Sequence, residues 1–312
     1  MPGSERTPGV RTRRGALEDI EFMAGAAIAL LDAVVRRQEK WAGVWRQRLA
    51  LSAAAMVAKR SGRAEDGVAL RDAVTLTRPG DDVGPAGRLL LAWRKLAARP
   101  AESLLSDQAV VAAAERFGFS SDDVIGEIAA AARDLSANDG PAVAASARML
   151  DTVAGLLPEA ERSLGAWLAD VVLARKLNWP VAVPLLGVQL FVTRSAAERE
   201  KSGRQQRSGP ALGEEWRKQQ CLAGLARAAI QAIDLSAELS RRAEMLLTVA
   251  PTLRAKGSDA VVERFLAEDA VVASDIIPGI SDRGLRRLFD RLFDLGAVRE
   301  LSGRSTFRIY GL

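Results

Sequence analysis

Six arginines near the end of the sequence have the spacing of a phosphate-binding surface. The first four recur at intervals of three and four residues, so a helix through them carries guanidinium groups on one side. Guanidinium groups bind phosphate oxygens through paired hydrogen bonds. The last two arginines stand in a strand–loop–strand segment that follows. The predicted DNA-binding residues are Arg283, Arg286, Arg287, Arg291, Arg304 and Arg308.

A helix over residues 281–295 is the element that must position the first four arginines. Ser281 is a typical N-cap residue, and Gly296 is typical of the position just beyond a helix end. At about 100° per residue, the apolar side chains gather on the side opposite the arginines. Those apolar residues are Leu285, Leu288, Phe289, Leu292, Phe293 and Leu295. The pattern predicts an amphipathic helix with its arginines in solvent.

Short elements surround this helix in the order of a winged helix, a relative of the helix-turn-helix. Residues 258–266 form a predicted helix, and residues 271–279 form a second short element. Two strands are predicted at 297–301 and 306–310, joined by a loop that forms the wing. The arginine helix is then the third helix. In DNA-binding winged helices the third helix enters the major groove, and the wing contacts the backbone or the minor groove.

Acidic residues leave a second interpretation open. Asp290 is one helical turn from Arg286, and Asp294 is three residues from Arg291, so surface ion pairs can neutralise arginine charge. Residues 255–312 carry nine basic and nine acidic side chains, which is a weak electrostatic match for DNA. Many winged helices dock proteins instead. The chain is therefore either a DNA-associated or regulatory protein, or a helical scaffold whose winged helix docks another protein.

Missing residue types narrow the catalytic options. The chain has no histidine and one cysteine, Cys221. Histidine-containing triads, histidine metal ligands, intrachain disulfides and Cys/His zinc sites are therefore excluded. Phosphate-binding-loop and nucleophile-elbow motifs are also missing. We predict no cofactor, no metal and no catalytic residue, and we expect Cys221 to be buried as a small apolar residue.

Two aspartates are the remaining candidates for chemistry. Asp32 and Asp170 each interrupt an apolar helical run. A carboxylate-based hydrolase that uses both is the least favoured of the three hypotheses. The simpler account is a buried ion pair for each carboxylate, with Arg46, Arg88 or Arg175 as the partner.

The whole composition favours a mainly α fold. The 312 residues are 48% apolar and 27% charged, and the apolar share is dominated by Ala, Leu and Val. Helical periodicity predicts a multi-helix domain over residues 16–250, with six tryptophans as core fillers and a mobile loop at about 194–213. Residues 1–15 are predicted to be a disordered basic tail, and 251–312 form the winged-helix-like domain.

The basic charge is concentrated in the predicted tail and loop. The net charge is +5 and the isoelectric point is about 9.8. Residues 1–14 and 194–218 each carry a net charge of +3, so the remainder of the chain is slightly acidic. No signal peptide or membrane span is predicted, and a cytoplasmic setting is expected. The partners expected are double-stranded DNA or another protein, with a homodimer as a further option and no membrane.

Several motifs mark the chain from about residue 16 onward. They are Trp41–Leu49, Gly80–Arg88, Trp167–Asp170, Ser281–Arg283, Arg286–Leu288, Leu295–Leu301, Ser302–Arg304 and Phe307–Tyr310. Together they resemble an uncharacterised alphaproteobacterial family, a bacterial domain of unknown function often encoded on plasmids. The resemblance implies no activity, cofactor or catalytic residue. The ending also resembles the winged helix that follows the catalytic domain in some Fic proteins, but the Fic motif needs a histidine, so that activity is not implied.

Overall fold

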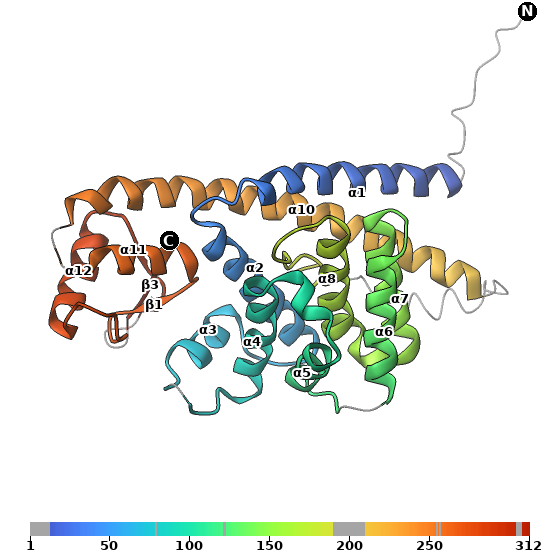
Figure 1. Ribbon diagram of the computed structural model, residues 1–312, viewed down its shortest axis with the longest axis horizontal. Coiled ribbons are helices and arrows are strands. Elements are labelled where there is room, and N and C mark those ends of the chain that lie inside the picture. Colours follow the sequence, from blue (N-terminus) through green and yellow to red (C-terminus); the bar gives the residue numbers. More distant parts are fainter. Residues whose placement is uncertain are drawn as a thin grey trace, which may run out of the picture.

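The computed structural model is mainly helical, with one small antiparallel sheet near the end of the chain (Figure 1). It describes residues 13–78, 80–120, 123–189, 210–253, 255, 257–303 and 308–312. The helices before the sheet region are α1 (Arg13–Arg36), α2 (Ala42–Arg60), α3 (Gly67–Thr75), α4 (Gly84–Ala98), α5 (Asp107–Phe117), α6 (Asp123–Ala137), α7 (Ala142–Leu156), α8 (Ala166–Lys176) and α10 (Pro210–Val249). Short 3-10 or π turns stand at η1 (Ala101–Leu105), η2 (Pro158–Ala160), η3 (Glu161–Gly165) and η4 (Ala250–Thr252).

Local sequence signals explain where several of these helices begin and end. The Asp66 side chain accepts a hydrogen bond from the Ala69 N–H at 2.9 Å and so caps the start of α3. Pro85 lies in the first turn of α4, where a proline costs no backbone hydrogen bond. Gly62 has a positive φ of 72° two residues beyond Arg60, the last residue of α2, which is the usual conformation of a glycine that ends a helix.

Helix α10 is the longest element and connects the two parts of the molecule. Its 40 residues span about 60 Å. Helix α1 packs along it, and α2 and α7 also contact it. Figure 1 shows α2 to α8 gathered beneath one stretch of α10, with the sheet region at the other end. None of the described helices is both long and apolar enough to cross a membrane.

Buried tryptophans fill the core, as predicted for all but Trp216, whose side chain lies outside the described residues. Two of them also bond across the core. The indole N–H of Trp45 donates to the Ala232 carbonyl at 2.8 Å, which ties α2 to α10. The indole N–H of Trp167 donates to the Ala92 carbonyl at 3.1 Å and joins α8 to α4. These bonds satisfy the polar edge of an otherwise apolar side chain.

The predicted tail and loop largely lie outside the described residues, which exclude 1–12 and 190–209. The first described residues after each of these two gaps are helical. Helix α1 starts at Arg13, within the stretch predicted as tail, and α10 starts at Pro210, within the stretch predicted as loop.

The last part of the chain, residues 258–312, is called the C-terminal module below. It contains α11 (Ser258–Ala267), β1 (Val271–Val272), α12 (Asp282–Asp294), β2 (Arg299–Glu300) and β3 (Ile309–Gly311). The strand order is β1–β3–β2, and both pairings are antiparallel. Val271 pairs with Tyr310, and Glu300 pairs with Tyr310 from the other side.

One predicted element of the module has a different structure. The segment 271–279, expected as a second short helix-like element, is a two-residue strand followed by turns. The strand exists because β3 supplies its hydrogen bonds, which is a contact with residues almost 40 positions further along the chain. The predicted hairpin strands are present in shorter form as β2 and β3.

The module is fixed to the helices before it by close packing and by buried charge. An added Cβ at Gly43 of α2 would lie 2.7 Å from the Ala267 Cα, so α11 approaches α2 more closely than a side chain allows. Within the module, the Phe289 ring packs against the tilted ring of Phe265 and edge-to-face against Tyr310, with centroids 5.2 and 5.1 Å apart. The other face of the sheet packs Ile309 against Leu76.

Candidate nucleic-acid interface

Helix α12 forms as the sequence predicts and carries the candidate site. The Ser281 hydroxyl accepts a hydrogen bond from the Gly284 N–H at 3.3 Å, so Ser281 is the N-cap. Gly296 has a positive φ of 68°, as expected just beyond the helix. Leu285, Leu288 and Phe289 are buried against the module core, as is Leu292.

Two residues assigned to the apolar side are not buried. Phe293 keeps 47% and Leu295 keeps 45% of its surface exposed. They lie in the last turn of α12 and just beyond it, where the core beneath the helix ends. Phe293 still contacts the Tyr310 ring edge-on, with centroids 6.4 Å apart. The buried face of α12 is therefore shorter than the helical wheel predicts.

The four arginines of α12 are all exposed, and they divide into two rows. Arg283, Arg287 and Arg291 follow one another at intervals of four residues and form a row of guanidinium groups about 6 Å apart along the helix. We call this the arginine row. Arg286 stands in the neighbouring row, between Asp282 and Asp290. Asp290 and Asp294 stand three residues beyond Arg287 and Arg291, so acidic residues flank the arginine row on one side.

The expected ion pairs on α12 do not form. Within the described residues, no carboxylate oxygen lies within 4.0 Å of a guanidinium nitrogen of Arg283, Arg286, Arg287 or Arg291. Asp290 and Asp294 therefore leave Arg286 and Arg291 free to contact an external anion. The count of nine basic and nine acidic residues over 255–312 does not reveal that the arginines of α12 lack ion pairs within the described residues.

The remaining two predicted arginines differ from those of α12. Arg308 is exposed, and its Nε lies 3.8 Å from a carboxylate oxygen of Glu300. A hydrogen bond with Tyr310, followed by the nearby Glu300, raises the pKa of Arg308 above its ordinary value. Arg304, the expected wing tip, lies outside the described residues.

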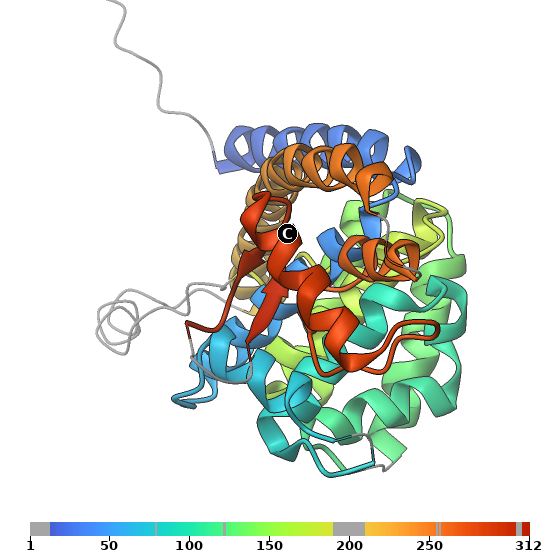
Figure 2. The ribbon, with the colours of Figure 1, turned by 90° about the vertical axis from the view of Figure 1, so that its left-hand side faces the viewer.

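A groove runs beside the arginine row. It has a volume of about 840 Å³ and separates α12 from the segment that follows α10. One wall carries Arg287, Leu288 and Arg291, and the other is formed by 251–253 with Ala255. The module stands at one end of the molecule (Figure 1), and Figure 2, which faces that end, places it in the foreground. The four arginines of α12 are exposed at this end of the molecule.

The two aspartates considered for hydrolysis have structural partners. Asp170 is completely buried, and its carboxylate accepts hydrogen bonds from the backbone N–H groups of Leu185 and Leu186 at 2.8 to 3.2 Å. Burial raises the pKa of Asp170 well above its ordinary value, against the lowering effect of those N–H donors. Asp32 accepts from the indole N–H of Trp179 and from Arg36, both at 2.7 Å.

Both aspartates thus hold the segment that follows α8. The arginine partners considered from the sequence are wrong: Arg88 pairs with Asp82, Arg175 approaches Glu102 at 3.7 Å, and Arg46 donates to the Ala97 carbonyl. Cys221 is buried, as predicted, and burial raises the pKa of its thiol.

Sequence reasoning missed two charged clusters. Asp269 is a buried carboxylate that binds Arg48 and Arg71, which lie about 200 residues earlier. No local signal marks such a contact. A second cluster of basic residues surrounds a pocket at α4, where Lys95 and Arg99 are four residues apart. Basic residues are common at the end of a helix, so their spacing in the sequence does not reveal the pocket.

Comparison with known proteins places the chain in a family. No curated protein matches it. The family described as "Protein of unknown function (DUF1403)" matches residues 2–312, which is nearly the whole sequence. The chain therefore belongs to the DUF1403 family.

Proposed function

We propose that this protein binds duplex DNA through α12, with the C-terminal module acting as a winged helix that lacks a regular second helix. The observation that carries the proposal is the exposed arginine row, Arg283, Arg287 and Arg291, which has no carboxylate partner among the described residues. A guanidinium group without a carboxylate partner can bind phosphate oxygens directly, and that binding releases the counterions that surround the DNA.

The topology of the module supports the same proposal. The module has a helix, a short strand, a second helix and two further strands, with the sheet order β1–β3–β2, and this order supports the proposed winged helix. In that arrangement α12 is the helix that enters the major groove. Arg286 and Arg308 then lie at the edges of the contact, beside acids that weaken their attraction for phosphate. Arg304 belongs to the proposed wing.

A regulatory role on a mobile replicon is part of the proposal. Its support is the resemblance of the motifs in this sequence to a plasmid-encoded bacterial family. A DNA-associated protein of this kind acts in the cytoplasm.

The test is the binding of a fluorescent mixed-sequence duplex, followed by anisotropy at several salt concentrations. Three phosphate contacts predict a slope of about −2.7 in log K against log salt, which is a loss of about 40-fold between 50 and 200 mM. Changing Arg283, Arg287 and Arg291 to Ala abolishes most of the binding. Arg287→Ala alone lowers the slope by about 1.

Two comparisons sharpen this experiment. Arg286→Ala, on the same helix but between two aspartates, has a smaller effect than Arg287→Ala. Arg148→Ala, an exposed arginine on α7, has none. The proposal fails if the duplex is not bound at 50 mM salt, or if the triple variant binds as well as Arg148→Ala.

Protein docking is the second candidate, favoured by one specific observation. Phe293, Leu295 and Met245 are each about half exposed, and the Met245 sulfur lies 3.9 Å from where a Cβ at Gly296 would stand. A small apolar patch therefore joins the end of α12 to α10. Docking through this patch predicts that Phe293→Ser and Leu295→Ser leave duplex binding unchanged and abolish association with a protein partner.

A further inference from the structure

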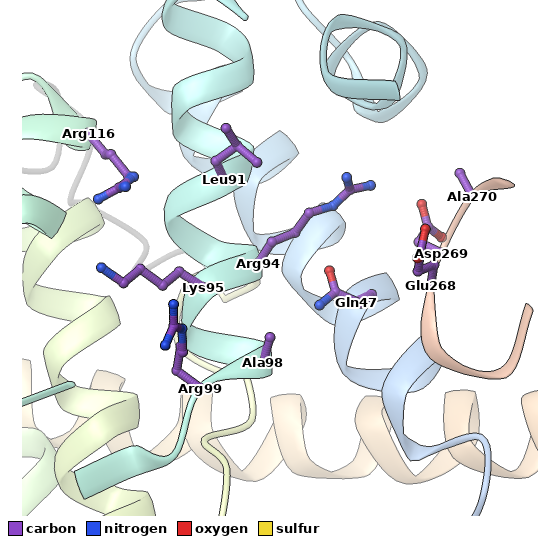
Figure 3. Close-up of a pocket in the computed structure, with 10 residues that line it drawn as sticks. All are labelled: Gln47, Leu91, Arg94, Lys95, Ala98, Arg99, Arg116, Glu268, Asp269 and Ala270. Carbon is purple, nitrogen blue, oxygen red and sulfur yellow. The ribbon is translucent and has the colours of Figure 1, made fainter. Parts of the chain in front are cut away.

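A basic pocket lies at the joint between the helices and the C-terminal module. Helix α4 forms one wall, with Arg116 of α5 beside it, and residues 268–270 form the opposite wall. Its volume is about 430 Å³. Figure 3 shows Lys95, Arg99 and Arg116 on one side of α4, and Arg94 extended toward Asp269 on the other.

The acids of this pocket are already neutralised by residues outside it. The Asp269 carboxylate binds Arg48 and Arg71. The Glu268 carboxylate accepts hydrogen bonds from Arg264 at 3.0 and 3.3 Å. Both acids still attract Arg94 electrostatically, but Lys95, Arg99 and Arg116 have no carboxylate partner among the described residues.

Four cations of the pocket have no carboxylate within 4.0 Å among the described residues. They are Arg94, Lys95, Arg99 and Arg116. Partial burial lowers the pKa of Lys95, and the positive charges of Arg116 and Arg99 lower it further. The Nε of Arg94 is buried and, within the described residues, has no hydrogen-bond partner. A bound anion would stabilise these neighbouring positive charges, because it places opposite charge beside them.

We infer that this pocket binds a small phosphorylated molecule, with its phosphate groups held by Lys95, Arg99 and Arg116. A group of two or more negative charges matches three cations better than a single carboxylate does, and arginine binds phosphate oxygens in pairs. A diphosphate or a nucleotide is the ligand class that fits this charge.

The remaining lining suits the uncharged part of such a ligand. Gln47 supplies a hydrogen-bonding amide, and Leu91 supplies an apolar surface. The volume of about 430 Å³ lies in the range of small-molecule sites and is too small and concave for a stretch of duplex. The ligand would contact both α4 and residues 268–270, so it would bridge the helices and the C-terminal module.

Isothermal titration of the full chain with inorganic pyrophosphate, and separately with ADP, tests the inference at constant ionic strength. One site per chain is expected. Lys95→Gln and Arg116→Gln each weaken binding at least fivefold, because each removes one charge from the phosphate-binding group. Arg148→Gln removes an exposed charge from α7, outside the pocket, and leaves binding unchanged. Thermal melting of each variant confirms that it is folded, and bound pyrophosphate raises the melting temperature only in proteins that keep the site.

This experiment is independent of duplex binding. Arg287→Ala should leave pyrophosphate binding intact, so the two proposals can fail separately. The inference is overturned if neither pyrophosphate nor ADP binds at millimolar concentration, or if the pocket variants bind them as tightly as the original chain. It is also overturned if Lys95→Gln and Arg116→Gln reduce duplex binding alone, because the pocket would then belong to a nucleic-acid surface.

Discussion

Removing the buried carboxylate of Asp269 should detach the C-terminal module from the helices that support it. Asp269 stands between α11 and β1 and is 1% exposed. Its carboxylate accepts from Arg48 of α2 and, at 2.8 Å, from Arg71 of α3. Arg48 also donates to the Leu312 backbone oxygen, so one guanidinium holds both the start of the sheet region and the last residue of the module.

The size of the effect follows from what Asp269→Ala leaves behind. Arg71 is 8% exposed, and without Asp269 its guanidinium is a buried charge with no carboxylate partner. Breaking a buried ion pair in this way costs about 3–5 kcal/mol. An exposed pair serves as the control. Glu102 lies 3.7 Å from Arg175 with 82% of its side chain accessible, and Glu102→Ala is expected to cost about 0–1 kcal/mol.

Urea unfolding followed by circular dichroism measures the free energy of unfolding of both variants. Hydrogen exchange then shows where stability is lost. We expect Asp269→Ala to increase exchange in β1 and β3, while α6 and α7 stay protected. A loss under 1 kcal/mol, equal to that of Glu102→Ala, would refute the argument that this carboxylate fixes the module.

Three further predictions concern single residues. Burial raises the folded-state pKa of the Asp170 carboxyl, so the stability that this group contributes is present below its unfolded pKa of about 3.9 and is lost as pH rises through the folded pKa. Between the unfolded and the folded pKa, Asp170→Asn should therefore become more stable relative to the original chain as pH rises. A difference in urea midpoints that does not change with pH would contradict this. Gly187→Ala would place a Cβ 2.4 Å from the Trp93 ring, and we expect thermal denaturation to show a loss of about 1–3 kcal/mol from overpacking. Ser281→Ala removes the hydrogen bond to the Gly284 N–H and should cost about 1 kcal/mol in urea unfolding; an unchanged midpoint would show that the cap is dispensable.

The parts of the fold predicted from the sequence are those set by neighbouring residues. The cap at Ser281, the stop at Gly296 and the apolar face of α12 depend on spacings of a few residues. The cap and the stop are confirmed, and the apolar face is confirmed up to Leu292. Helices α3 and α5 were not predicted, although Asp66 and Ser106 are ordinary N-cap residues and their side chains do cap these helices.

The parts that escaped prediction depend on distant contacts. Strand β1 is two residues long and exists only through its pairing with β3. Asp170 was noticed as an acid in an apolar helix, but its partners are backbone N–H groups that no pattern of side chains reveals. The pairing of Asp269 with Arg48 joins residues 221 positions apart. For the candidate interface, the exposure of the arginine row could be predicted, but the absence of ion pairs on α12 could not.

Because α10 is long, a small change in its tilt moves its ends by a large distance. Over about 60 Å, a tilt of about 5° at one end displaces the other end by about 5 Å. Helices α1 and α7 pack against one part of α10, and the C-terminal module contacts α10 through α11 and η4. Because Asp269 also ties the module to α2 and α3, a tilt of α10 redirects α12 only if those buried contacts are broken.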